Sequence, residues 1–305
     1  MSADRLGIFE SHRPHLLAIA YRMLGEMSAG EDVVQEAWLR WQRADAAEVR
    51  DPRAWLSAAT VRLSLDALRK ARARRETYVG PWLPEPILPD DMRGLAADSA
   101  ASRAELASDL SLALLHVLER LSPEERAAFI LHDAFDCDYP TIARTLEKSE
   151  QACRKLVSRA RERVKADRPR HSVASGHHRA LVEKFLQAAV KGDPEELSSL
   201  LAGDVVLYSD GGGRAAAALN PIYGAAKVVR FGLGVMRKFA VDGISLEPTD
   251  INGTPGYLIL APEGLHTAVT MEFDGELISA IYLVRNPDKL GRVSRRSSAG
   301  SSPSA

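Results

Sequence analysis

Cationic side chains are concentrated along residues 139–164, YPTIARTLEKSEQACRKLVSRARERV. Lysine and arginine neutralise DNA phosphates, and arginine, glutamine and glutamate also bond to base edges. Apolar residues at helical spacing, Cys153, Val157, Ala160 and Val164, predict a helix with one buried face here. The side chains that we expect to face DNA from this helix are Glu150, Gln151, Arg154, Lys155, Ser158 and Arg159.

The elements that would position these side chains are two short helices joined by a tight polar turn. Ser149 is placed to cap the second helix by accepting hydrogen bonds from its first free amides. This layout is typical of a helix-turn-helix, whose second helix enters the DNA major groove. A solvated basic helix on a small bundle would give the same pattern.

The distribution of charge favours nucleic-acid binding more than the total does. The net charge is −1, but residues 50–75 hold eight Lys and Arg against two acids, and residues 144–170 hold ten against four. Between them, residues 76–125 hold ten acids and three bases. Two basic blocks separated by an acidic connector fit a protein that contacts phosphates at two places.

Length and composition limit the class of protein. A chain of 305 residues with 46% apolar residues suits two or three soluble domains. No apolar run approaches 18 residues and no secretory signal is visible, so we expect a cytoplasmic protein with no membrane segment. Cys137 and Cys153 fit reduced thiols, and the eight histidines are scattered, so neither a metal site nor a cofactor is expected.

Residues 1–75 predict a first all-α domain. Amphipathic helices are expected over 8–24 and 29–43, with Ser28 and Glu31 as a capping box for the second. Asp51 and Pro52 are a strong start signal for a third helix, which ends in a basic run.

A proline-rich stretch separates this domain from the next. Residues 76–104 are expected to be a linker, but their apolar side chains indicate that they dock on another surface. A second all-α domain, with the helix-turn-helix, is expected over 105–166, and a hinge over 167–177.

The remaining sequence changes from helical to alternating patterns. Helices over 178–190, 194–202 and 224–239 and strands near 205–210, 244–248, 256–261, 265–273 and 276–284 predict an α+β domain with an antiparallel sheet over 178–290. Asp274-Gly275 predicts a hairpin turn, and residues 291–305 predict a disordered tail.

Two helical domains, each with a basic helix and joined by a connector, resemble the extracytoplasmic-function sigma factors of bacteria. SAGEDVVQEAWLRWQR is similar to the family's polymerase-binding helix, DPRAWLSAATVRLSLDALRKARARRE to its −10 segment, and residues 121–164 to its −35 domain. WLPEP, DGGGR and NPDKL recur in the SigJ-like members, which carry a SnoaL-like C-terminal domain. The expected fold is thus multidomain, with two all-α domains followed by an α+β SnoaL-like cone.

The resemblance implies partners and roles. The partners would be promoter DNA and the β′ clamp of core RNA polymerase. Polymerase contacts fall to Asp32, Gln35, Glu36 and Arg40. Contacts to the −10 element fall to Arg53, Arg62, Asp66, Arg69, Lys70 and Arg72. Arg62 stands where many members carry asparagine, whereas Trp55 is expected in the core rather than as a base-stacking platform.

The SnoaL-like domain has two interpretations. As a built-in regulator it would pack on the helical domains and the linker, and so constrain the spacing of the two DNA-reading surfaces. The regulatory residues would then be Trp82, Leu83, Pro84, Glu85 and Pro86, with Asp210, Gly211, Gly212, Gly213 and Arg214, and Asn286, Pro287, Asp288, Lys289 and Leu290. As an enzyme of the cyclase or isomerase kind, it would use Tyr208, Asp210, Arg214 or His266 as acid and base.

The first interpretation is preferred, because no acid–base pair stands out and three successive glycines favour close backbone docking. The expected function is therefore a sigma factor without catalytic residues, and an unknown ligand or protein could bind its third domain. Two rivals stay open: a SnoaL-like enzyme with a DNA-binding appendage, and a repressor that senses a ligand. A repressor would usually need two-fold symmetry.

Overall fold

The computed structural model describes residues 2–45, 49–75, 77–95, 110–167, 175–238, 244–262 and 264–299. The chain forms two compact units. The first comprises Met1–Thr77, Arg93–Asp109 and Leu114–Arg168, and the second comprises Tyr78–Met92, Leu110–Ala113 and Pro169–Ala305.

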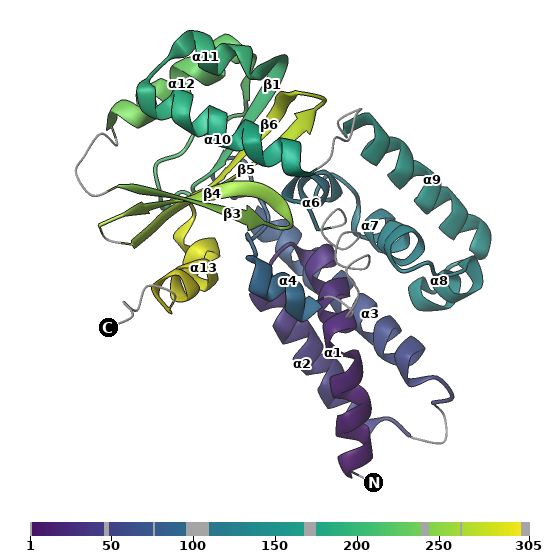
Figure 1. Cartoon of the computed structure of the whole chain (residues 1–305). Coiled ribbons are helices and arrows are strands. Elements are labelled where there is room, and N and C mark those ends of the chain that lie inside the picture. Colours follow the sequence, from purple (N-terminus) through teal and green to yellow (C-terminus); the bar gives the residue numbers. More distant parts are fainter. Residues whose placement is uncertain are drawn as a thin grey trace. The chain divides into compact units, whose positions relative to one another are not determined.

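The first unit begins with three helices that lie side by side (Figure 1): α1 Ser2–Leu24, α2 Met27–Arg43 and α3 Pro52–Arg75. Leu16, Ile19, Ala37 and Leu56 are completely buried in the core. The expected capping box of Ser28 and Glu31 is wrong, because α2 begins at Met27, and its N-cap, Glu26, makes no side-chain cap bond. Gly25 ends α1 at φ +70°, and buried Met27 joins the core at once, so only two residues separate the helices.

The second half of this unit is also helical. Its elements are α6 Leu112–Leu118 from Leu114 onward, α7 Pro123–Phe129, the π-helix η1 Ile130–Ala134, α8 Tyr139–Leu146 and α9 Glu150–Asp167. A complete capping box of Ser122 and Glu125 starts α7, as the sequence indicates. α8 and α9 are the two helices of the predicted helix-turn-helix, and Glu147 forms the turn at φ +57°.

Two arginines connect the first half of this unit, which contains α1 to α3, with its second half. One arginine lies in each half and bonds to a helix of the other half. Arg126 of α7 donates to the carbonyl of Met23, in the last turn of α1, over 2.7 Å. Arg62 of α3 donates to the carbonyls of Arg144 and Thr145, in the last turn of α8, over 2.8 and 3.0 Å. The last carbonyls of a helix lack partners within it, so each guanidinium caps the end of a helix in the other half.

His15 lies in the same region and is sensitive to pH. Its ring contacts Phe135 edge-on at 4.8 Å, and its Nε2 lies 3.1 Å from Ser57 Oγ. Burial, with the neighbouring charge of Arg53, lowers the pKa of His15 to about 4.

This lowered pKa predicts a loss of stability in mild acid. An unfolded histidine has a pKa of about 6.5, so the unfolded chain binds the extra proton first, and stability falls as the pH drops from 6.5 towards 4. The loss between pH 7.5 and 5 is expected to be about 2 kcal/mol for this residue. Urea unfolding followed by tryptophan fluorescence measures it, and His15→Gln should flatten the pH dependence. An equal slope in both proteins would contradict the assignment.

The second unit contains a six-stranded sheet in the order β2-β1-β6-β5-β4-β3. Its strands are β1 Leu201–Asp210, β2 Ile222–Tyr223, β3 Ser245–Ile251, β4 Thr254–Ala261, β5 Gly264–Asp274 and β6 Leu277–Val284. The sheet is not wholly antiparallel as expected, because β1 pairs with β6 in parallel. The predicted hairpin turn between β5 and β6 is present but shifted by one residue, with Gly275, at φ +61°, and Glu276 in the turn.

Two apolar cores lie on opposite faces of this sheet. Helices α10 Ser175–Lys191, α11 Pro194–Ser199 and α12 Ala225–Lys238 cover one face, where Val269, Met271 and Ile281 are buried (Figure 1). The other face packs against α13 Pro287–Ala299 and, through Leu83, against the proline-rich segment.

Two boundaries therefore need correction. The expected linker does dock, and residues 78–92 belong to the unit that contains the sheet. The expected disordered tail, 291–305, is wrong as far as Ala299, because α13 continues through it and buries Val293 completely; residues 300–305 lie outside the described part.

Neither a membrane span nor a metal cluster is found in the described part of the chain. No helix there has the length and apolarity to cross a bilayer. Nor do three or more His, Cys, Asp or Glu side chains converge there as metal ligands.

Candidate nucleic-acid interface

Helix α9 presents the predicted DNA-reading residues to solvent. Its buried stripe is Cys153, Val157, Ala160 and Val164, each 5% exposed or less. The amide of Ala152 donates to Ser149 Oγ over 3.2 Å, so the predicted N-cap is confirmed. All six candidates on this helix are exposed: Glu150, Gln151, Arg154, Lys155, Ser158 and Arg159.

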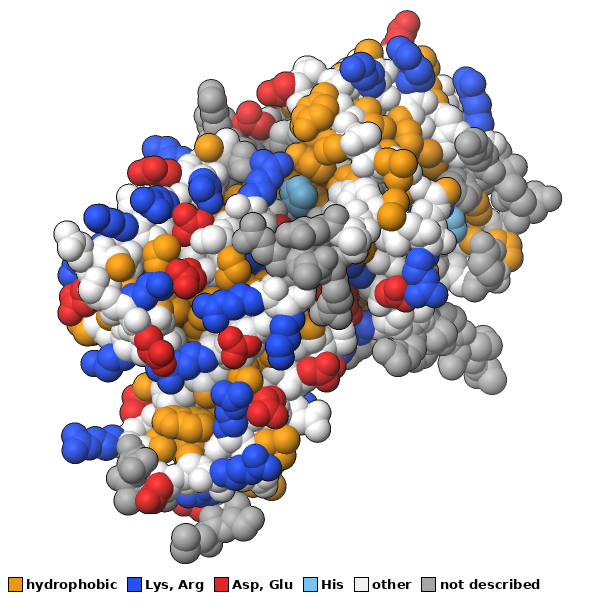
Figure 2. Space-filling model, turned by 180° about the vertical axis from the view of Figure 1, so that it is seen from behind, with side chains coloured by type: hydrophobic (Ala, Val, Ile, Leu, Met, Phe, Trp, Pro, Cys, Tyr) orange, Lys and Arg blue, Asp and Glu red, His pale blue; other side chains and the backbone are white. Residues whose placement is uncertain are grey.

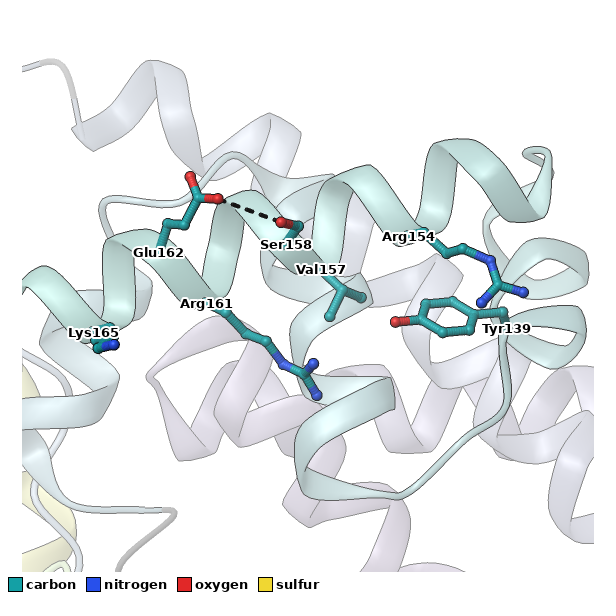
Figure 3. A pocket seen from close by; sticks show the side chains of 7 residues that line it. All are labelled: Tyr139, Arg154, Val157, Ser158, Arg161, Glu162 and Lys165. Carbon is teal, nitrogen blue, oxygen red and sulfur yellow. Dashed lines mark hydrogen bonds between the residues drawn. The ribbon is translucent and has the colours of Figure 1, made fainter.

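A hollow of about 250 Å³ lies beside α9 (Figure 3). Arg154 and Arg161 point towards the side where Tyr139 lies, whereas Ser158 and Glu162 point to the other side and share a hydrogen bond. The guanidinium of Arg154 lies 4.3 Å from the centre of the Tyr139 ring, and its Nη2 lies 3.3 Å from Glu150 Oε2.

Two side chains of the π-helix η1, Asp133 and His132, bind Arg161 of α9. Its Nη2 lies 2.7 Å from Asp133 Oδ1 and donates to His132 Nδ1 over 3.2 Å. The hydrogen bond with Asp133 raises the pKa of Arg161 above its ordinary value. Because an arginine always donates, His132 accepts at Nδ1 and carries its proton on Nε2.

Helix α3 exposes most of the residues predicted to contact the −10 element. Arg53, Asp66, Arg69 and Lys70 are exposed; the side chain of Arg72 lies outside the described part. Arg69 pairs with Asp66 at 3.3 Å and with Glu124 at 3.6 Å.

Arg62 is also exposed, but its guanidinium is bonded to protein. Besides the two carbonyls of α8, its Nη2 lies 3.5 Å from Glu147 Oε1. It lines a cleft of about 750 Å³ together with Arg50, Arg144 and Trp55. Trp55 is half-buried and packs against Trp41, with ring centres 5.5 Å apart. It therefore contacts the core and also lines the cleft.

The residues predicted to bind polymerase lie along one side of α2. All four, Asp32, Gln35, Glu36 and Arg40, are exposed. Glu36 and Arg40 form an ion pair at 3.2 Å. On the face shown in Figure 2, basic and acidic side chains are interspersed, so a single-sign field does not cover it. No broad positive patch is visible on this face.

The three sequence motifs WLPEP, DGGGR and NPDKL meet in the second unit around buried Asp210. One oxygen of Asp210 accepts from Tyr78 Oη at 2.5 Å, and the other from the amide of Leu83 at 2.9 Å. Lys289 Nζ lies 2.7 Å from the second oxygen, donates to the carbonyl of Leu83 and lies 3.9 Å from the centre of the Trp82 ring. This aspartate–lysine pair fastens the proline-rich segment to the sheet.

The segment has a second attachment at Asn252. Asn252 is completely buried, and its Oδ1 accepts from the amide of Ile87 at 3.0 Å. Its Nδ2 donates to the carbonyl of Leu110 over 2.8 Å, and its own amide donates to the carbonyl of Ile87 over 2.9 Å. One side chain therefore binds the chain just after WLPEP and again just before α6.

The four candidates for acid–base chemistry do not converge on one place. Tyr208 stacks on Tyr282, Asp210 pairs with Lys289, and Arg214 pairs with exposed Asp288. The ring of His266 accepts at Nε2 from Arg285 over 2.8 Å. These contacts support the docking interpretation of DGGGR.

Comparison with known proteins decides the family. Residues 8–74 match the model of sigma-70 region 2, and residues 111–164 match that of sigma-70 region 4. The chain is 39% identical over 297 residues to the ECF RNA polymerase sigma factor SigJ of Mycobacterium tuberculosis, with 92% of this chain and 91% of that protein covered. The chain is an extracytoplasmic-function sigma factor.

Further relatives agree. A probable ECF sigma factor, SigI, from the same species is 31% identical over 284 residues, covering 92% of this sigma factor and 93% of the relative. The crystal structure of SigJ superposes with a TM-score of 0.74 at 34% identity, covering 94% of this chain and 98% of that one. The helical regions 2 and 4 followed by a C-terminal helix-and-sheet domain are therefore shared with SigJ.

Several contacts in this sigma factor escape sequence reasoning. Tyr139, His132 and Asp133 contact side chains of α9 but carry no sequence signal of their own. Asn252 could have been found, because Asn-Gly between two alternating runs predicts a two-residue hairpin. Asn252 and Gly253 both have positive φ, +54° and +76°, between β3 and β4.

Proposed function

We propose that this sigma factor divides promoter recognition among the three exposed surfaces described above. α9 of region 4 would read the −35 element through Arg154 and its neighbours. α3 of region 2 would contact the −10 element, and the polar side of α2 would bind the β′ clamp of core polymerase. The observation that supports this division most directly is the exposure of all six candidate residues on a helix whose other face is fully buried. Because bacterial transcription takes place in the cytoplasm, we expect the protein to act there.

Run-off transcription with purified core polymerase tests the proposal. The full-length chain is expected to join core enzyme and to start transcripts at defined sites on genomic fragments. A polymerase that gains no start sites on addition of the chain would contradict it. Activity on a small-molecule substrate without polymerase would instead favour the enzyme alternative.

Arg154 is expected to carry sequence preference. Arg154→Ala should weaken binding to the preferred −35 element by about 1 to 3 kcal/mol and relax the preference at one base pair. Arg159→Ala is the matched control, because an arginine that only grips phosphate should weaken all sequences equally and lower the salt slope by about 1. Competition binding of the holoenzyme on −35 variants measures both. An equal loss on every sequence for Arg154→Ala would remove its base-reading role.

We also propose that the SnoaL-like domain is a built-in regulator that acts through the segment joining regions 2 and 4. Residues 78–88 leave the end of region 2, and Leu110 precedes region 4. Asp210, Lys289 and Asn252 hold both points of this connection. Docking therefore shortens the free length of chain between the two DNA-reading domains, which limits the distance they can span. A ligand or protein that binds the third domain would act on the same connection.

A truncation series tests regulation. Cutting just before Asn286 removes Lys289 and α13 but leaves the sheet, whereas cutting near Ala180 removes the whole third domain. The two shortened proteins and the full chain are expected to differ clearly in transcription from one promoter. Equal activity at all three lengths would refute the regulatory role.

A further inference from the structure

A stack of side chains leads from the π-helix η1 to Arg154. The rings of His132 and Tyr139 lie 4.7 Å apart at 50°. The guanidinium of Arg154, on α9, lies 4.3 Å from the centre of the Tyr139 ring, on α8. His132 is in turn bonded to Arg161, which is paired with Asp133. Five side chains from three consecutive elements therefore form one connected row, of which Figure 3 shows Tyr139, Arg154 and Arg161.

Within this row the Tyr139 ring contacts both His132 of η1 and Arg154 of α9. Tyr139 is the first residue of α8, after Asp138, whose Oδ1 accepts from the amide of Thr141 at 2.9 Å. His132 of η1, which contacts the ring, is itself bonded to Arg161 of α9. The ring is half-buried, while the Arg154 side chain is 57% exposed. The aromatic surface is therefore anchored, and the arginine on it faces solvent.

An arginine in such a position would otherwise be mobile. A free arginine side chain has much rotamer entropy to lose when it binds. The ion pair with Glu150 is exposed on both sides, and pairs of this kind contribute little. A cation over an aromatic ring is attracted to the ring face, and this attraction is stronger than that of an exposed ion pair within one helix. Tyr139 is thus the stronger of the two restraints on Arg154.

We propose that Tyr139 is a positioning residue for base readout, which orients the Arg154 guanidinium before DNA arrives. This inference rests on the proposed −35 role of Arg154. Binding a base edge with two parallel hydrogen bonds needs a fixed guanidinium plane, so orientation contributes to the discrimination between bases more than to overall affinity.

The test uses holoenzyme and a library of templates randomised at the −35 element of a promoter that it transcribes. Tyr139→Leu, which removes the ring face but keeps an apolar side chain, should reduce discrimination at the base read by Arg154 by about 2- to 5-fold. Tyr139→Phe, which keeps the ring, should retain the wild-type preference. Tyr223→Leu, on the exposed strand β2 of the other unit, is the control for loss of a tyrosine.

The outcomes separate this inference from the role of Arg154. An unchanged preference in Tyr139→Leu, or an equal loss on all sequences, overturns the inference alone. An unchanged preference in Arg154→Ala overturns both. Tyr139→Leu combined with Arg154→Ala should discriminate no less than Arg154→Ala alone. Should Tyr139→Leu melt below the assay temperature, His132→Ala, which keeps Tyr139 but removes its backing, should give a smaller loss at the same base, and no loss would refute the row.

Discussion

Replacing Lys289 with methionine is expected to free residues 78–88 from the sheet and to lower the free energy of unfolding of the second unit by about 3 to 5 kcal/mol. Lys289 is 5% exposed and Asp210 is fully buried, so removal of the ammonium leaves a buried carboxylate without its cation. The same change removes the hydrogen bond to the Leu83 carbonyl and the contact with the Trp82 ring. Loss of one partner from a buried pair is costly for this reason.

Hydrogen exchange measures the release directly. The amides of Leu83 and Ile87 are bonded to Asp210 and Asn252, and both should exchange faster in Lys289→Met. The matched control is Asp288→Asn, one residue earlier, because Asp288 and Arg214 are each 61% exposed, and such pairs contribute less than about 1 kcal/mol. Similar effects of the two substitutions would show that the buried pair does not hold the segment.

Replacing Gly212 with alanine is expected to disrupt the same contact sterically. Gly212 has φ +59°, and a Cβ there would lie 2.3 Å from Nδ2 of Asn286 and 3.0 Å from the Tyr78 hydroxyl. Asn286 cannot yield freely, because it is 4% exposed and its Nδ2 donates to Tyr78 Oη over 2.9 Å. The left-handed backbone costs about 1 to 2 kcal/mol and the overpacking about 1 to 3 kcal/mol more.

Gly275→Ala separates these two contributions. Gly275 has nearly the same angle, φ +61°, but its Cβ would enter open space in the β5–β6 turn. Only the backbone cost is expected there, so thermal unfolding should show a clearly larger loss for Gly212→Ala. Gly212→Ala should also alter transcription in the same direction as the cut before Asn286, whereas Gly275→Ala should leave it unchanged. Equal losses of stability would mean that Asn286 moves without penalty.

Local signals in this chain were sufficient for most helices. The Ser122–Glu125 capping box, the Asp51–Pro52 start and the Ser149 cap all act within four residues, and all three are present. The apolar residues of the linker correctly predicted docking, because so much apolar surface is unfavourable in water. The partner of the linker could not be derived in detail, since Asp210 and Lys289 lie more than a hundred residues beyond it.

The sequence predictions that were wrong failed because tertiary packing, which local patterns do not reveal, decides the structure there. The tail 291–299 is rich in arginine and serine, which predicts disorder, yet Leu290 and Val293 lie one turn apart and bury against the sheet. β1 begins at Leu201, where a helix was expected, because its start pairs with β6 in parallel. The predicted exposure of the candidate DNA-binding residues held for all six on α9, while Arg62 of α3 has protein partners that the pattern of charges could not reveal.

The bonds that Arg62 makes to α8 in the first unit have a consequence for the proposed promoter contacts. Promoter elements two helical turns apart are separated by roughly 70 Å, whereas Arg62 of α3 lies within hydrogen-bonding distance of α8. Under the proposed division of promoter recognition, the bonds from Arg62 to α8 would therefore have to break before one molecule could contact both elements. If Arg62 then bound a DNA phosphate, as proposed for α3, the phosphate and the carbonyls of α8 would compete as acceptors for the same guanidinium.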